Sequence, residues 1–136
     1  MSVFLDSNIV LYALGDEESK RAIAAGLLAT YPSISTQVIN ECSHVLRRKL
    51  KLPPNQVAEE MQNVMDVVQL RDVGLHEIRT AWQIAARYGF GHYDCLIIAT
   101  ALSAGCSTLY TEDLQHGQII ENQLALLNPF ALPTTQ

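Results

Sequence analysis

The chain has 136 residues, of which 49% are hydrophobic and 17% are charged. This balance excludes an intrinsically disordered protein, and the length fits one compact unit, so we expect residues 1–136 to form a single domain. Fourteen Asp and Glu residues against nine Lys and Arg residues give a net charge of −5, which argues against a broad basic surface for duplex DNA. This charge does not exclude an enzyme whose acidic site stays negative until a metal enters.

Three cysteines, Cys42, Cys95 and Cys106, are odd in number and have no C-x-x-C spacing. Each lies among small or branched apolar residues, where free cysteine usually serves as a buried hydrophobe. A disulfide framework is therefore not expected, and a reducing, cytoplasmic location is. The N-terminus has no basic segment of the kind that begins a signal peptide, and Asp6 interrupts its apolar run.

The first part of the chain alternates between short apolar runs and amphipathic segments. Residues 2–5 predict a strand that stops at Asp6-Ser7-Asn8, three residues that favour turns and helix caps. Residues 16–30 predict a helix with an acidic first turn, and residues 33–35 predict a second strand. Ser35 or Thr36 would cap the next helix, in which apolar residues recur at helical spacing from position 38 to position 50.

Pro53 and Pro54 end that helix and begin another, whose apolar stripe extends to Val68. Residues 70–75 predict a third strand. The helix that follows ends at the glycines of residues 88–91, and one of its faces is marked by Ile78, Trp82, Ala85 and Gly89.

The stretch from Cys95 to Thr111 carries no charge, but it is slightly shorter than a membrane span and contains several Ser, Thr and Gly residues. We therefore expect no membrane attachment. The stretch predicts a buried helix over residues 94–104, ended by Gly105, and a buried strand over residues 107–110. Residues 124–127 predict the last strand.

Strands that alternate with helices predict an α/β fold, with a mainly parallel central sheet and helices on both faces. The strands are continuously apolar, as buried central strands are. Active sites in such sheets form beyond the carboxyl ends of the strands. Asp6 directly follows the first strand, and Thr111-Glu112-Asp113 follows the strand at 107–110, so Asp6 and Asp113 are expected on the same edge.

Each candidate acid has an ordinary structural explanation when it is taken alone. Asp6 and Asp94 both suit helix caps, and Glu41, one position from an apolar stripe, suits a solvated boundary. Together with Asp113, however, they are carboxylates that one cleft could hold, where they would repel one another and force protonation unless a cation binds. Mg²⁺ and Mn²⁺ prefer oxygen ligands, and either could activate a water and stabilise charge on a phosphoryl oxygen.

Five segments resemble the PIN-domain ribonucleases, specifically the VapC-type toxins of toxin–antitoxin pairs. They are FLDSNIVLYAL, STQVINEC, HYDCLIIATAL, LYTEDLQHGQ and the closing NPF. The HYD and TEDLQHGQ segments are the specific ones, whereas D-S-N alone would be weak. Ser7 and Cys95 stand where the family often has Thr and Ala, and both are small.

The resemblance implies a PIN-like three-layer fold and assigns the site by position. The catalytic residues and metal ligands would be Asp6, Glu41, Asp94 and Asp113, supported by Ser7, Asn8 and Thr111. Glu112 is adjacent to the site, but the strand pattern points it the other way.

The same resemblance implies an endoribonuclease that hydrolyses RNA phosphodiester bonds by metal-activated water, leaving 5′-phosphate and 3′-hydroxyl ends. Its cofactor would be Mg²⁺ or Mn²⁺. A cognate antitoxin protein would block the acidic cleft, the toxin would form a homodimer, and operator DNA would be contacted only through the antitoxin.

The remaining polar features have simpler explanations. The four histidines show no ligand spacing and are expected to be structural or surface residues. Arg47, Arg48, Lys49 and Lys51 form the only basic cluster in the sequence, for which a solvated helix end is the default interpretation. The alternative is that this cluster binds RNA phosphates beside Glu41. Trp82 fits a core or a dimer face better than a base-stacking position.

Two other functions compete with the ribonuclease. An acidic phosphorelay receiver would need a Lys after a late strand, but no basic residue follows Arg87. A catalytically weak PIN-fold module that binds RNA or protein is the second alternative, and the presence of all four acids argues against it.

Overall fold

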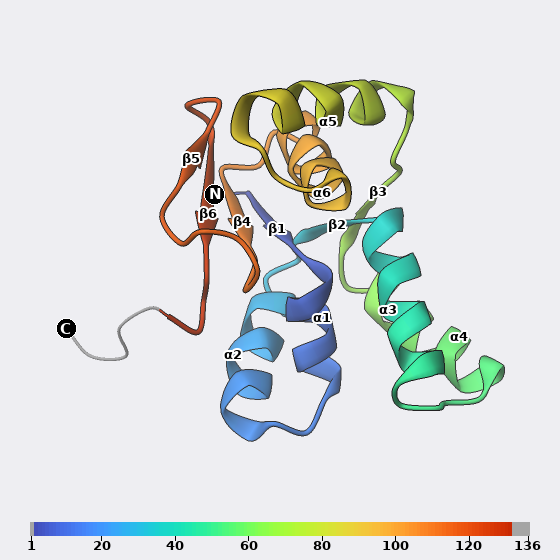
Figure 1. The fold of residues 1–136 in the computed structure, drawn as a ribbon. Coiled ribbons are helices and arrows are strands. Elements are labelled where there is room, and N and C mark those ends of the chain that lie inside the picture. The colour runs from blue at the N-terminus through green and yellow to red at the C-terminus, as the bar shows by residue number, and fades with distance from the viewer. Residues whose placement is uncertain (1, 132–136) are drawn as a thin grey trace.

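A computed structural model describes residues 2–131 of the chain (Figure 1). The elements follow one another as β1 (Val3–Leu5), α1 (Ser7–Leu14), α2 (Glu18–Leu28), β2 (Ser33–Ser35), α3 (Thr36–Arg48), α4 (Pro54–Met65), β3 (Gln69–Arg71), α5 (Leu75–Tyr88), α6 (His92–Ser103), β4 (Thr108–Tyr110), β5 (Ile119–Ile120) and β6 (Leu124–Leu127). The predicted domain of residues 1–136 also includes residue 1 and residues 132–136, which lie outside the described residues.

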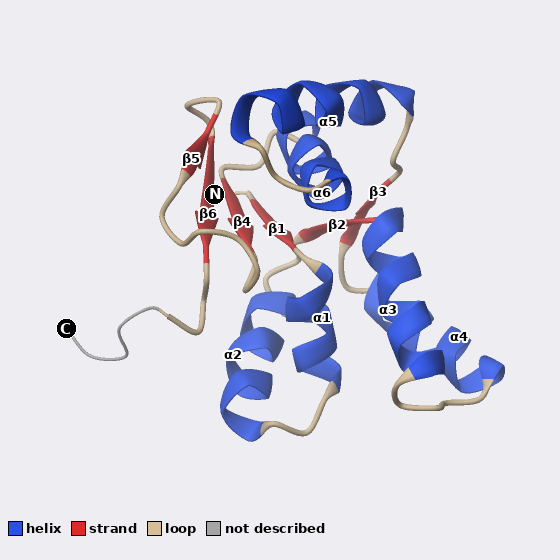
Figure 2. Ribbon diagram, in the orientation of Figure 1, coloured by secondary structure: helices blue, strands red, loops and turns tan. Residues whose placement is uncertain are grey.

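The sheet has the strand order β3-β2-β1-β4-β6-β5, and all its pairings are parallel except that of β5 with β6. In Figure 2, α5 and α6 lie above the sheet and the other helices lie below it. The predicted fold class, a mainly parallel sheet between helical layers, is confirmed.

The core lies on both faces of the central strands. Phe4 and Leu109 are neighbours across the β1–β4 pairing and are completely buried. Cys95 to Ala101 are all buried, so the apolar segment forms the predicted interior helix, α6, and is followed by the predicted strand, β4. No helix in the described part of the chain has both the length and the apolar character needed to span a membrane.

Several boundaries differ from the prediction. Of the two interpretations of Asp6-Ser7-Asn8, the helix cap is confirmed, because Asp6 caps α1; that helix itself, which begins at Ser7, was not predicted. The predicted helix at 16–30 is confined to Glu18–Leu28, and the predicted strand at 70–75 is β3, which ends at Arg71. α6 begins at His92 rather than at Asp94, which is therefore a first-turn residue and not the cap. β5 was not predicted.

Trp82 was predicted on the buried face of α5 or on a dimer face. Its side chain is 58% exposed, so it does not belong to the core of this chain. The buried residues of α5 are instead Ala81 and Ile84, which puts Trp82 on the solvent side of the helix.

Candidate active site

The site begins where β1 and β4 end side by side. Leu5 pairs with Tyr110, and the Asp6 amide donates to the Tyr110 carbonyl over 3.0 Å. This register places Asp6 beside Thr111, whose hydroxyl donates to Asp6 Oδ2 over 2.8 Å. The same hydroxyl oxygen accepts from the Asp113 amide over 3.2 Å. Thr111 thus connects two of the predicted acids, although they are far apart in sequence.

Asp6 is both a helix cap and a buried carboxylate. Its Oδ1 accepts from the Ser7 amide over 2.7 Å, and its side chain is almost entirely covered. Burial raises the pKa of Asp6 from 3.8 to about 6; the bonds from Thr111 and Ser7 limit that rise, and the negative charges of Glu41 and Asp113 add to it. Asp6 is therefore both the N-cap of α1 and a member of the group of acids; neither interpretation excludes the other.

Glu41 is oriented by a neighbour one turn earlier on α3. The Gln37 amide nitrogen donates to Glu41 Oε2 over 3.0 Å and to the Tyr93 carbonyl oxygen over 3.1 Å. Gln37 therefore ties Glu41 to the first turn of α6, which carries Asp94. Sequence reasoning missed Gln37, although its spacing of four residues from Glu41 is typical of helical side-chain pairs.

Asp94 and Asp113 approach the same space from α6 and from the segment after β4. Asp94 is half-buried, and its pKa is raised by burial first and then by the charges of Asp113 and Glu41. Asp113 is exposed. The negative charges of Glu41 and Asp113 thus add to the rise in the pKa of both Asp6 and Asp94, as expected for carboxylates that line one cleft.

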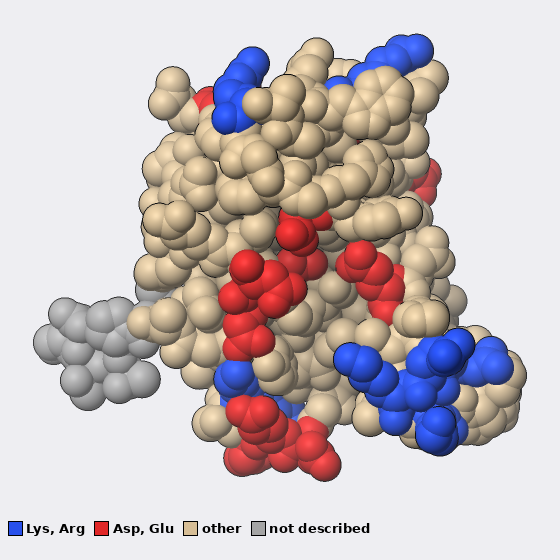
Figure 3. Space-filling model, in the orientation of Figure 1, with Lys and Arg blue, Asp and Glu red and all other residues tan. Residues whose placement is uncertain are grey.

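All four acids line one cleft of about 980 Å³. Its lining consists of Asp6, Ser7, Thr36, Gln37, Asn40, Glu41, His44, Val45, Val73, Tyr93, Asp94, Leu96, Ile97 and Asp113. No Lys or Arg is among these lining residues, so within the described part of the chain His44 is the one lining side chain that could carry a positive charge. Figure 3 shows acidic residues gathered at the centre of this face.

The donor set of the cleft suits a hard divalent cation. Carboxylate oxygens are the ligands that Mg²⁺ and Mn²⁺ prefer, and a bound cation would offset the repulsion that adds to the effect of burial on the pKa values of Asp6 and Asp94. Within residues 2–131, no three His, Cys, Asp or Glu side chains lie close enough together to form a metal-binding group. The carboxylates thus share one cleft without converging on one point.

The other predicted supporting residues have different surroundings. Ser7 lines the cleft, whereas Asn8 and Thr111 are not among its lining residues. The Asn8 amide oxygen accepts from the Glu112 backbone N–H over 3.4 Å, and its buried amide nitrogen has no hydrogen-bond partner among residues 2–131. Asn8 therefore contacts the segment that carries Asp113 and does not face the cleft itself.

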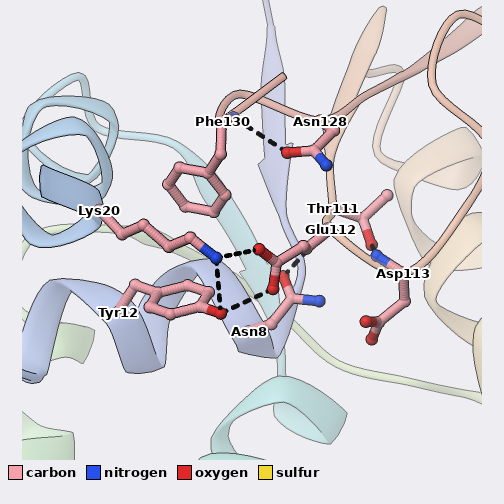
Figure 4. A network of polar contacts seen from close by, with 8 residues as sticks. All are labelled: Asn8, Tyr12, Lys20, Thr111, Glu112, Asp113, Asn128 and Phe130. Carbon is pink, nitrogen blue, oxygen red and sulfur yellow. Dashed lines mark hydrogen bonds and ion pairs between the residues drawn. The ribbon is translucent and has the colours of Figure 1, made fainter. Parts of the chain in front are cut away.

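Glu112 points away from Asp113, as Figure 4 shows. Its carboxylate accepts from Lys20 Nζ over 2.5 Å and from the Tyr12 hydroxyl over 2.7 Å. The bond from Lys20 is the main reason that the pKa of Glu112 is lowered. Lys20 Nζ also lies 4.6 Å from the centre of the Tyr12 ring and 5.1 Å from that of Phe130. This network fixes the back of the 111–113 segment to α1 and α2, and sequence reasoning did not find it.

The family model described as "PIN domain" matches residues 3–121, which is most of the chain. The chain belongs to the PIN domain family. The match covers all four acids and the segments that carry them, and membership of this family removes the phosphorelay receiver as an explanation. No curated protein matches the chain in sequence.

Solved structures share this PIN fold over nearly their whole lengths. VapC20 of Mycobacterium tuberculosis, a toxin that cleaves the sarcin–ricin loop, has a TM-score of 0.66 at 19% identity, covering 82% of this chain and 90% of its own. A toxin–antitoxin complex from Klebsiella pneumoniae has a TM-score of 0.70 at 17% identity, covering 94% and 98%. VapBC2 of Rickettsia felis, bound to a promoter DNA fragment, has a TM-score of 0.68 at 21% identity, covering 94% and 100%.

Proposed function

We propose that this PIN-domain chain is a metal-dependent endoribonuclease and the toxin of a VapBC-type toxin–antitoxin pair. The observation that carries the proposal is the single cleft that Asp6, Glu41, Asp94 and Asp113 line together, with no Lys or Arg among the described residues of its lining. The fold shared with VapC20, which cleaves RNA in the sarcin–ricin loop, supports the same class of substrate.

Asp6, Glu41, Asp94 and Asp113 would hold Mg²⁺ or Mn²⁺ through their carboxylate oxygens. When bound, the cation supplies a water of lowered pKa and stabilises the charge that develops on the phosphoryl oxygen. The protein positions this chemistry. The Thr111 hydroxyl bonds to both the Asp6 carboxylate and the Asp113 amide and so fixes their relative position. Gln37 bonds to both Glu41 and the Tyr93 carbonyl, which holds Glu41 against the first turn of α6. In this mechanism water attacks the phosphodiester, so no side chain of the protein acts as the nucleophile.

The solved structures that share the fold also support the proposed partners of this chain. The Klebsiella and Rickettsia structures are complexes with antitoxins, and the second is bound to promoter DNA. We therefore propose a cognate antitoxin that covers the acidic cleft, contact with operator DNA only through that antitoxin, and a homodimer of the toxin, working in the cytoplasm.

The deciding experiment is an RNA cleavage assay with Mg²⁺ or Mn²⁺, repeated in EDTA. Asp6→Asn should lose cleavage, while Asp16→Asn, the same change at an exposed residue outside the cleft lining, should retain it. Activity that survives in folded Asp6→Asn would refute the metal-site mechanism. Absence of cleavage by the unaltered protein, with RNA or protein binding retained, would instead favour a PIN-fold binding module.

A further inference from the structure

A second cavity lies away from the acidic cleft, mostly where β1, β2 and β3 begin. Its volume of about 810 Å³ is in the range of small-molecule sites, and it is here called the amino-edge pocket. Its lining includes Ser2, Thr30, Tyr31, Gln69, Arg71 and Ser107. β1 leads directly into α1 beside the cleft, so the start of β1 lies at the opposite edge of the sheet (Figure 1). The described linings of the pocket and the cleft have no residue in common.

The charge of the amino-edge pocket is the reverse of that of the cleft. Arg71 lines it, and no Asp or Glu is among its described lining residues, although the whole chain has fourteen. Arg71 belongs to none of the three ion pairs found within residues 2–131. A half-buried guanidinium without a carboxylate partner is suited to bind an anion from solution, because its planar fork matches carboxylate and phosphate oxygens.

Two weak contacts hold Arg71 and leave most of its donors unused. Its Nε donates to Ser33 Oγ over 3.5 Å, and its Nη2 donates to Gln69 Oε1 over 3.4 Å. Both distances are at the long limit of hydrogen bonding, and a guanidinium has five N–H donors. In the described part of the chain Arg71 side-chain donors make no other hydrogen bond. Several N–H groups are thus left for a ligand.

Tyr31 lines the same pocket with a strained backbone. Its φ of 59° lies in the left-handed region, which a bulky side chain rarely adopts. Tyr31 is also 60% exposed, so packing in the core does not offset this strain. The Gln69 side chain donates to the Tyr31 carbonyl over 3.2 Å while it accepts from Arg71. Gln69 therefore fixes the aromatic residue and the guanidinium relative to each other, as expected of a binding site.

Three hydroxyl groups of the pocket lining can act only as acceptors. Ser2 Oγ donates to the Gly105 carbonyl over 3.0 Å, and Ser107 Oγ donates to the Ser2 carbonyl over 3.2 Å. Thr30 Oγ1 donates to the Leu27 carbonyl over 2.7 Å. Each hydroxyl has a single hydrogen, so only its oxygen lone pairs remain for a ligand. A complementary ligand carries hydroxyl or amino donors in addition to its anionic group.

We propose that the amino-edge pocket binds a nucleoside monophosphate. The phosphate pairs with Arg71, the sugar hydroxyls donate to the Ser and Thr oxygens, and the base packs against Tyr31. One phosphate suits the pocket better than two or three, because Arg71 is the one Lys or Arg in its described lining. The assignment is independent of the proposed ribonuclease function, since it uses none of the cleft residues.

The test is isothermal titration calorimetry in EDTA. The probes are adenosine 5′-monophosphate (AMP), its 2′,3′-dideoxy form, adenosine, inorganic phosphate and phenylalanine, which has a carboxylate and a ring. The variants are Arg71→Gln, Tyr31→Phe and Tyr31→Asn, because Asn tolerates a positive φ and removes only the ring. Arg79→Gln is the matched control, since Arg79 is exposed and outside the pocket lining. Thermal melting shows that each variant is folded.

Arg71→Gln should weaken AMP binding by roughly 10- to 160-fold, through loss of charge-assisted hydrogen bonds, whereas Arg79→Gln should not change it. Tyr31→Asn should weaken it by roughly fivefold to 150-fold, and Tyr31→Phe should retain it. Adenosine and inorganic phosphate should each bind more weakly than AMP, and the dideoxy form should bind roughly two- to tenfold more weakly. The melting temperature of Tyr31→Asn should not fall, because the strain is relieved.

Failure of the unaltered protein to bind AMP, or equal binding by Arg71→Gln, would overturn the proposal. So would adenosine or phenylalanine binding as tightly as AMP, since neither has a phosphate. Loss of AMP binding in Asp6→Asn would place the ligand in the acidic cleft instead. A lower melting temperature for Tyr31→Asn would show that Tyr31 serves the fold and not a ligand. RNA cleavage with Mg²⁺ or Mn²⁺ should be unchanged in Arg71→Gln, so failure of this proposal is distinguishable from failure of the ribonuclease function.

Discussion

Replacing Asp6 by Asn should stabilise the metal-free protein at neutral pH, although it removes a proposed catalytic acid. The pKa of Asp6 rises from 3.8 to about 6 on folding, mainly because the carboxylate is buried. The folded state therefore binds this proton more tightly than the unfolded state. The stability that protonated Asp6 contributes is fully present below pH 3.8 and is lost as the pH rises through 6.

A shift of this size corresponds to about 3 kcal/mol at pH 7.5, and to about 0.5 kcal/mol near pH 4. Asn carries no charge, so it avoids this cost, but it cannot accept from both Ser7 and Thr111 as the carboxylate does. The net gain in the free energy of unfolding should thus be about 1–3 kcal/mol at pH 7.5. For a chain of this length, the melting temperature should rise by roughly 3–10 °C.

Thermal or urea unfolding in EDTA measures this difference at pH 7.5 and at pH 4. Asp16→Asn serves as the control, since Asp16 is exposed and its replacement should change neither value. The reasoning is wrong if Asp6→Asn is as stable as the unaltered protein at pH 7.5, or if any gain is equally large at pH 4. Either result would mean that ionised Asp6 carries little desolvation cost in the folded state.

Three further changes probe the contacts around the cleft. Thr111→Val should reduce RNA cleavage by about 10- to 100-fold, because it removes the hydroxyl that orients Asp6 and the Asp113 amide; Thr111→Ser should restore most of it, and equal loss in both variants would contradict this role. Lys20→Met should lower cleavage by no more than about fivefold, since its bond to Glu112 is partly exposed and acts only from behind the segment; a larger loss in a steady-state assay would show a more direct part. Cys42 should resist iodoacetamide in the folded protein, because burial, Glu41 and Asp6 raise the pKa of its thiol to about 12; rapid labelling, detected by mass spectrometry, would contradict its buried position.

Most of the fold follows from apolar periodicity, but short elements do not. The interior helix α6 and the strand β6 were predicted because each contains a continuous apolar run bounded by polar or turn residues. α1 was missed because Asp6-Ser7-Asn8 suits a turn as well as a helix start, and only tertiary packing decides between them. β5 has two residues, too few for any periodicity to show.

Part of the site could likewise be predicted from the sequence and part could not. Strand order alone puts Asp6 and Asp113 on one edge, because both follow strands that prove to be neighbours. The grouping of Glu41 and Asp94 with them rested more on the resemblance to a family, and the structure brings all four into one cleft, where their roles remain a prediction. The bond between Lys20 and Glu112 joins residues 92 positions apart, and no spacing rule could have indicated it.

The segment after β4 carries two adjacent acids with opposite surroundings. Glu112 is paired with Lys20 behind the sheet edge, while Asp113 faces the cleft, whose described lining contains no Lys or Arg. Inserting one residue before Glu112 would move Glu112 to the cleft position and leave Lys20 without its carboxylate, whereas deleting one residue there would move Asp113 to the position beside Lys20 and out of the cleft. Selection should therefore act more strictly on the length of this segment than on the identity of its middle residue, and insertions should be tolerated only beyond Asp113.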